Sequence, residues 1–176
     1  LGDVYKRQGN KKFYFLQGPP YTSGDLHCGQ AWNHALKDMI LRYKRMNGFD
    51  VWDRAGYDMH GLPVARRIQQ KFNLVTKEDI ERFGVEKFTD ECFRYAMETT
   101  HIMTDVLQKM GVWLDFSDPY LPVSTEYIEG IWWVVKKAEE QNRLYEGLKV
   151  MTWCYDCETA CAKHELEYVN VKDCLL

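Results

Sequence analysis

The sequence feature that most constrains the fold is a glycine- and proline-rich turn between an apolar run and a helical pattern. Residues 13–17 read as a buried strand, the turn occupies residues 18–24, and His27 stands where the helical pattern begins. The order strand, turn and helix is typical of α/β proteins. A helix N-terminus offers unpaired N–H groups and positive dipole potential, and phosphate is the anion it usually binds. The turn therefore predicts a nucleotide-handling α/β domain.

The helical pattern after Gly24 carries an apolar stripe that we expect to face the core. Its members recur at helical spacing and are Trp32, Leu36, Met39, Ile40 and Tyr43. Gly48 is expected to end this helix, and residues 49–53 to form the next strand. A strand, helix and strand this close in sequence predict a parallel βαβ unit with a right-handed crossover.

Further helices and strands are predicted along the rest of the chain. The helices are expected at residues 64–72, 78–83 and 86–110, a loop at 113–122, and strands at 144–153 and 165–171. Ser124 is the expected N-cap of one more helix, since serine oxygens accept from the first backbone N–H groups. The core stripe predicted for that helix consists of Ile128, Ile131, Trp132, Val135 and Ala138.

Composition indicates one folded domain. The chain has 176 residues, 45% of them apolar, and a formal net charge of −3. This length permits a real core, and the charge balance gives no support for a surface that coats nucleic acid. No apolar run approaches the ~20 residues of a membrane span, so no membrane partner is expected. Six cysteines without a secretory leader favour a reduced, cytoplasmic setting.

Both ends of the chain look foreign to the fold. Residues 1–8 resemble translated adapter sequence and are expected to be a non-native leader. Residues 172–176 are expected to be a similar tail. We interpret the remainder as a piece of a longer protein.

His27 and Gln30 are the first candidate site residues. At positions i and i+3 they share one helix face, where both could donate to phosphate oxygens. Gly29 between them has no side chain, so a flat base could approach the backbone. The alternative is an ordinary surface histidine, but the turn and strand before it favour a functional role.

Asp58 is the second candidate, because it lies just past the end of the second predicted strand. Ligands of open α/β sheets bind at that edge. A carboxylate there could hold an ammonium group or a ribose hydroxyl. The alternative is an aspartate that only forms a turn.

Cys154 and Cys157 form a C-x2-C turn, which is half of a tetrahedral zinc site. Cys161 and His164 are nearby candidates for the other ligands, but their spacing is cramped and a distant pair is favoured over them. Two thiols without a metal are the other interpretation. The many aromatic residues are expected to lie in the core.

Together these residues carry a resemblance to a known family. The motifs are Gly18-Pro19-Pro20-Tyr21 with Gly24, Asp58-Met59-His60-Gly61-Leu62-Pro63, Gly111-Val112-Trp113, Glu126-Tyr127-Ile128-Glu129-Gly130, and Trp153-Cys154 with Cys157 through His164-Glu165-Leu166-Glu167-Tyr168. Over residues 12–171 the chain resembles the N-terminal part of a class I aminoacyl-tRNA synthetase of the isoleucyl type. The valine enzymes read Pro-Pro-Pro-Asn and Asp-His-Ala-Gly at the first two motifs, and the leucine enzymes start with Pro-Tyr-Pro-Ser-Gly.

The resemblance implies the first half of a Rossmann-like, parallel-sheet α/β catalytic domain with helical connections, truncated where the editing insertion starts. That half would cover residues 9–152, and residues 153–171 would hold the cysteine turn and the start of the insertion. The implied activity is ATP-dependent formation of isoleucyl-adenylate, with Mg²⁺, followed by transfer to tRNA(Ile). The intact enzyme would be a monomer, and the fragment alone would not be competent.

The resemblance also assigns roles to single residues. His27 and Gln30 would be catalytic and, with Gly29, would bind ATP. The other assignments are amino-acid binding for Gly18, Pro19 and Asp58, and one half of a structural zinc site for Cys154 and Cys157.

Two departures from the family pattern stand out. Gln30 replaces the second histidine of His-Ile-Gly-His; losing one charge-assisted hydrogen bond costs roughly 1 kcal/mol, so activity can survive. Cys161 replaces an aliphatic residue. The alternatives that remain are a valyl- or leucyl-tRNA synthetase fragment, another nucleotidyltransferase, and a free-standing zinc-binding module.

Overall fold

The computed structural model describes residues 10–155, 158–163 and 166–170. The chain divides into two compact units, Leu1–Trp133 and Val134–Leu176. The first unit contains a three-stranded sheet whose strands are β1 (Lys12–Phe15), β2 (Asp50–Gly56) and β3 (Asp115–Tyr120), in the order β1-β2-β3. Its helices are α1 (Cys28–Met46), α2 (Leu62–Phe72), α3 (Lys77–Phe83) and α4 (Val85–Lys109). Helix α5 (Thr125–Glu140) crosses the division.

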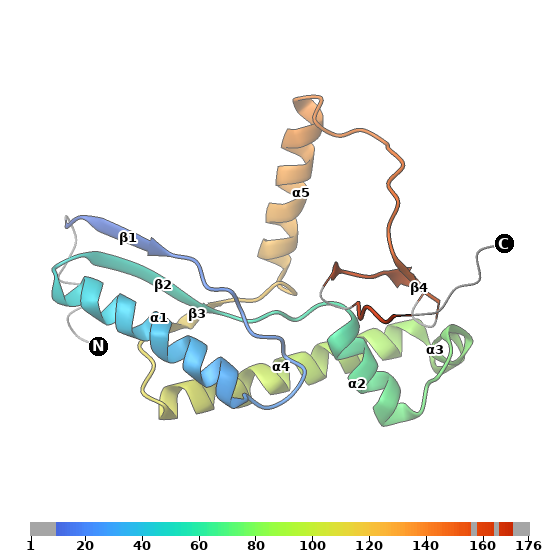
Figure 1. Ribbon diagram of the computed structural model, residues 1–176, viewed down its shortest axis with the longest axis horizontal. Coiled ribbons are helices and arrows are strands. Elements are labelled where there is room, and N and C mark those ends of the chain that lie inside the picture. The colour runs from blue at the N-terminus through green and yellow to red at the C-terminus, as the bar shows by residue number, and fades with distance from the viewer. Residues whose placement is uncertain (1–9, 156–157, 164–165, 171–176) are drawn as a thin grey trace. The chain divides into compact units, whose positions relative to one another are not determined.

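The predicted parallel βαβ unit is confirmed. Strands β1 and β2 pair in parallel, with Phe13 opposite Val51 and Phe15 opposite Asp53, and α1 connects them (Figure 1). Because side chains alternate along a strand, these four residues share one face. The parallel sheet with helical connections agrees with the predicted α/β class.

Strand β3 replaces the loop predicted at residues 113–122, which is a correction. It pairs in parallel with β2 at Asp115 and Tyr120, with a shift of register between them. Arg54 donates to the carbonyl and carboxylate oxygens of Asp118 at 2.8 Å, which ties the two strands together. Pro119 lacks an N–H, and such a residue is tolerated at a sheet edge or bulge. Polar composition and proline therefore concealed the strand.

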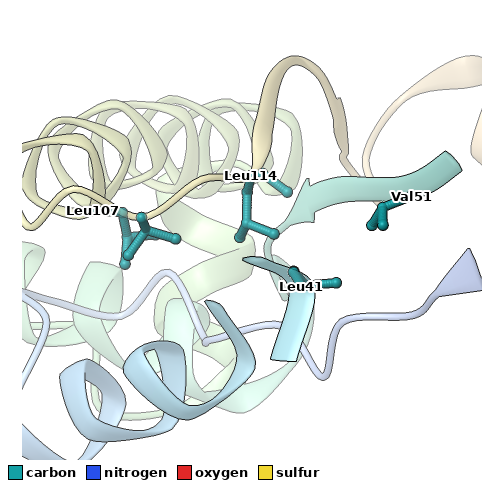
Figure 2. Close-up of a cluster of buried hydrophobic side chains, with 6 residues drawn as sticks. Leu41, Val51, Leu107 and Leu114 are labelled. Carbon is teal, nitrogen blue, oxygen red and sulfur yellow. The ribbon is translucent and has the colours of Figure 1, made fainter. Parts of the chain in front are cut away.

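The main core lies between α1, α4 and one face of the sheet. Figure 2 shows Leu41 of α1, Val51 of β2, Leu107 of α4 and Leu114, which precedes β3. Each is at most 7% exposed. This cluster fixes α1 on the sheet and so determines where the start of α1 lies.

A second buried cluster joins α2 and α4 to the segment that follows β2. It contains Tyr57, Met59, Val64, Ala96 and Met103. The Tyr57 hydroxyl is also hydrogen-bonded to the Thr104 hydroxyl on α4, and burial raises the pKa of Tyr57. Asp58 lies between Tyr57 and Met59, so its backbone is held in place from both sides.

The predicted core stripe of α1 is wrong. Trp32, Leu36, Met39, Ile40 and Tyr43 are all exposed, and the helix buries His34 and Leu41 instead. The two buried residues are seven apart, so α1 touches the rest of the unit along a narrow line. The five residues do have helical spacing, but they lie on a face of α1 that is not packed against the described core.

The core stripe predicted for α5 is also wrong, because none of its residues is buried. The helix is capped as expected, because Tyr127 N donates to Ser124 Oγ at 3.2 Å. It nevertheless has no buried residue, and Trp132 is 67% exposed.

The second unit departs most from expectation. Of the strand predicted at residues 144–153, only the last residue is in a strand; β4 (Trp153–Cys154) pairs antiparallel with β5 (Thr159–Ala160). Residues 166–170 form no strand, and the two ends of that predicted strand lie outside the described residues. None of the described helices has the length and apolar character that a membrane crossing requires.

Candidate functional site

The glycine- and proline-rich turn is fastened to the segment that follows β2. Thr22, which is fully buried, donates from N to the Asp58 carbonyl at 2.9 Å and from its hydroxyl at 3.2 Å. Asp58 N donates to the Pro20 carbonyl at 2.8 Å. These bonds continue the parallel pairing of β1 and β2 beyond their ends. The turn therefore lies at the carboxyl edge of the sheet, where ligands of α/β proteins bind.

Two cations hold the turn from other elements. Lys37 Nζ on α1 donates to the Gly18 carbonyl at 3.1 Å, and Arg67 Nε on α2 donates to the Ser23 carbonyl at 2.9 Å. Burial lowers the pKa of Lys37. Both side chains therefore tie the turn to helices α1 and α2.

His27 is the N-cap of α1 and forms a reciprocal capping box with Gln30. Its Nδ1 accepts from Gly29 N at 3.1 Å and Gln30 N at 3.4 Å, and Gln30 Oε1 accepts from His27 N at 3.1 Å. Backbone N–H groups can only donate, so Nδ1 carries no proton here and a neutral ring has its proton on Nε2. His27 therefore presents an N–H donor outward at the start of the helix.

Gly29 makes room for the His27 ring. A Cβ at this position would lie 3.1 Å from His27 Cε1 and 3.2 Å from Nδ1. The absence of a side chain therefore serves the histidine, in addition to any approach of a ligand to the backbone.

His34 lies one helical turn beyond Gln30 and is 2% exposed. Its Nδ1 is 2.8 Å from the Gln30 carbonyl oxygen, and its Nε2 is 3.1 Å from Gln17 Nε2. Burial, opposed by the Gln30 hydrogen bond and reinforced by the charge of Lys37, lowers the pKa of His34. The histidine links the end of β1 to the first turn of α1.

A cavity of about 610 Å³ opens over these groups. It collects most of the residues that the sequence singled out, namely Gly18, Pro19, His27, Gly29 and Gln30. Asp58 is half-buried and is not in the lining; only its backbone meets the turn. Burial, then the hydrogen bond to Tyr127 and the charge of that residue, and last the negative charge of Asp58 raise the pKa of Tyr120 to about 12.

Sequence reasoning missed three contributors to the cavity and its frame. His34 and Arg67 line it, and Lys37 holds its rim. The spacing of His27, Gln30 and His34 at i, i+3 and i+7 marks one helix face and could have revealed His34. Arg67 reaches the turn only through tertiary packing of α2, so no local pattern indicates it.

The predicted zinc half site lies partly outside the described residues. Cys154 is in β4, whereas Cys157 and the nearby candidate His164 are not described. Among the residues that are described, no cluster of three or more potential ligands could hold a metal. Of the other cysteines, Cys92 packs against the second core cluster and Cys28 is exposed.

The family model described as tRNA synthetases class I (I, L, M and V) matches residues 3–175. The chain belongs to the class I tRNA synthetases.

Relatives of this synthetase chain are named isoleucine–tRNA ligase. The protein of Methanocella arvoryzae is 49% identical over 96% of this chain and 15% of its own length. The protein of Archaeoglobus fulgidus is 45% identical over 97% of this chain and 17% of its own length. The chain thus spans about a sixth of the relatives that it matches.

A solved structure supports the fold of the synthetase chain. The LeuRS of Agrobacterium radiobacter K84, in a ternary complex with tRNA and LeuAMS, matches with a TM-score of 0.58 and 21% identity, over 77% of this chain and 15% of that protein.

Proposed function

We propose that this chain is part of an isoleucine–tRNA ligase, which activates isoleucine with ATP and transfers it to tRNA(Ile). The observation that carries the proposal is the start of α1 in the cavity lining, where His27 caps the helix through Nδ1 and keeps Nε2 for a ligand. The names of the curated relatives support isoleucine as the amino acid.

The start of α1 suits the phosphates of ATP. Its first turn contains no acidic residue, so the dipole is not neutralised by a charge within the helix. His27 would donate from Nε2. Gln30 would donate from its amide nitrogen, while its oxygen accepts from His27 N. Mg²⁺ would enter with ATP and neutralise phosphate charge.

The amino acid would lie at the turn. Gly18 and Pro19 offer an apolar wall in the cavity lining. Asp58 would offer its carboxylate to the substrate ammonium from beside the turn, since its side chain lies outside that lining. The isoleucine carboxylate oxygen would attack the α-phosphorus; a new C–O–P linkage forms, the bond to the bridging oxygen breaks, and pyrophosphate leaves with the electron pair. No enzyme nucleophile is needed, so catalysis is positioning and stabilisation of phosphate charge.

The remaining features of the intact enzyme are also part of the proposal. We place it in the cytoplasm as a monomer, with Cys154 and Cys157 as half of a structural zinc site. This chain alone would not complete the reaction.

Isoleucine-dependent exchange of pyrophosphate into ATP, measured on the full-length protein of the parent gene, tests the proposal. We expect exchange with isoleucine and a kcat/KM for valine lower by about 10- to 200-fold, the range for one methylene. A preference for valine or leucine would overturn the choice of substrate. No exchange with any of the three would overturn the proposed activity.

A further inference from the structure

His34 lies beneath the cavity and connects two elements that shape it. Its Nδ1 is 2.8 Å from the Gln30 carbonyl oxygen in the first turn of α1, and its Nε2 is 3.1 Å from the amide nitrogen of Gln17, which follows β1. The residue is 2% exposed. A buried imidazole with a partner on each ring nitrogen is held in a single orientation.

The two partners also determine where the proton of His34 lies. The Gln30 carbonyl can only accept, so Nδ1 carries a proton; the Gln17 amide nitrogen can only donate, so Nε2 carries a lone pair. Both bonds coexist only when the ring is neutral. With the amide in this orientation, a proton on Nε2 would face the donor nitrogen of Gln17. The contact would persist only if the amide turned over so that its Oε1, buried and without a hydrogen-bond partner among the described residues, accepted from the ring.

A continuous series of hydrogen bonds leads from His34 to His27. His34 holds the Gln30 carbonyl, Gln30 Oε1 accepts from His27 N at 3.1 Å, and His27 Nδ1 accepts from Gln30 N at 3.4 Å. A displacement of the Gln30 backbone is therefore passed to the ring that points at the cavity.

We propose that His34 is a positioning residue for the nucleotide site, which acts through Gln30 on His27 and does so only in its uncharged form. The proposal rests on the proposed function, because it assigns the site around His27 to ATP.

The charges around His34 agree with an uncharged ring at neutral pH. Lys37 on the same helix acts on His34 with its positive charge, and the cavity lining contains the positive charge of Arg67 from α2 and the negative charge of Asp25 in the turn. Burial and Lys37 both lower the pKa of His34, against the Gln30 hydrogen bond. Protonation therefore begins below the ordinary histidine range and removes the acceptor that Gln17 uses.

Two substitutions separate positioning from titration. His34→Asn places an amide nitrogen close to the position of Nδ1, so the bond to Gln30 can persist while the titration is lost. His34→Leu removes both bonds. His101→Asn, at an exposed position on α4, is the matched control.

The decisive experiment is calorimetric titration of the full-length parent protein with ATP and Mg²⁺ between pH 5.5 and 7.5. We expect the ATP Kd of the wild type to rise by about threefold more than that of His34→Asn as the pH falls, a comparison that cancels the titration of ATP itself. At pH 7.5 His34→Leu should raise the Kd by about tenfold, the value of one hydrogen bond. His101→Asn should match the wild type.

The opposite results are equally clear. Identical pH profiles for the wild type and His34→Asn would overturn the proposal, and this comparison stands even if His34→Leu fails to fold. Equal increases of KM for ATP and isoleucine in His34→Leu would reduce His34 to a structural residue. If the wild type showed no isoleucine-dependent exchange, the proposed function would be refuted instead. The ATP-binding measurements would still decide the role of His34.

Discussion

The two ends of helix α1 are held in different ways. At the N-terminal end, His27 and Gln30 cap the helix and His34 braces it, all through uncharged hydrogen bonds. At the C-terminal end, Arg45 forms an ion pair with the buried Asp53 of β2 and donates to the Trp113 carbonyl at 3.0 Å.

A second charged contact strengthens the C-terminal end. Asp38 accepts from Trp113 N at 2.8 Å and from Arg42 Nε at 2.6 Å, and the Arg42 guanidinium lies 4.1 Å from the centre of the Trp113 ring. The two ends of α1 therefore have different tasks, since one is packed on the sheet and the other lines the cavity. Charged contacts anchor the helix on the sheet, and hydrogen bonds of His27, Gln30 and His34 shape the end that lines the cavity.

The largest expected effect comes from breaking the charged end. Arg45→Met keeps the aliphatic bulk but leaves the Asp53 carboxylate buried without its partner, and we expect a loss of about 3 kcal/mol in the free energy of unfolding at pH 7.5. Burial already raises the pKa of Asp53 despite Arg45. The loss should therefore shrink as the pH falls and Asp53 takes up a proton. Urea unfolding followed by tryptophan fluorescence measures the loss at pH 7.5 and its decrease at lower pH.

Asp118→Asn is the control for this prediction. Asp118 pairs with Arg54, but its side chain is 72% exposed. Exposed pairs contribute about 0–1 kcal/mol, so unfolding should barely change. A similar loss in both variants would mean that burial does not set the strength of these pairs.

The next largest effect concerns activity at the other end. His27→Asn keeps a good N-cap, so the helix should stay intact, but it removes the outward Nε2–H. We expect kcat for pyrophosphate exchange in the full-length protein to fall by about 10²-fold, as for the loss of one preorganised donor. His27→Ala should lose a similar factor and about 1 kcal/mol of stability from the missing cap. Unchanged exchange in His27→Asn would remove His27 from the site.

Local patterns explain how much of this arrangement could be predicted. The β1-α1-β2 unit and the start of α1 follow from a turn, an N-cap and apolar spacing within one short stretch, so the sequence alone indicated them. The same stretch placed Gly18, Pro19, His27, Gly29 and Gln30 around one cavity. These are consequences of neighbouring residues and regular periods.

The errors share a different physical cause. The stripe that includes Trp32 and Tyr43 has helical spacing, but spacing does not say which partner covers it, and within the described residues the face is exposed. Strand β3 has no apolar alternation and gains its place by pairing with β2. Likewise, Arg67 reaches the turn only because α2 packs on α4. The exposure of the stripe, the pairing of β3 and the position of Arg67 all depend on tertiary contacts, which local sequence patterns do not reveal.

Gly29→Ala should have two smaller effects, a favourable one on helix stability and an unfavourable one on ATP binding. An alanine is the better helix former by up to about 1 kcal/mol, which favours the helix. Its Cβ would lie 3.1 Å from His27 Cε1, so the ring must shift. We expect a stability that is unchanged or slightly higher and a KM for ATP that is raised about threefold to tenfold, as for a weakened hydrogen bond. Gly130→Ala in α5, where a Cβ meets nothing within 4 Å, is the control and should leave KM unchanged.

The smallest effect is a difference in pH response between the two ends. The pKa of His34 is lowered, so the unfolded chain binds more protons than the folded chain just below pH 6.5, and stability is lost as the pH falls from there toward the folded pKa. The pKa of Asp53 is raised, so its effect has the opposite sign: the cost of keeping it ionised is relieved as the pH falls through its folded pKa toward the ordinary value of 3.8. Urea unfolding at pH 7.5 and 5.5 should therefore show a smaller acid loss in His34→Asn than in the wild type. An equal acid loss in the two proteins would show that His34 stays neutral across this range, and the N-terminal end would then resist acid as the charged end does.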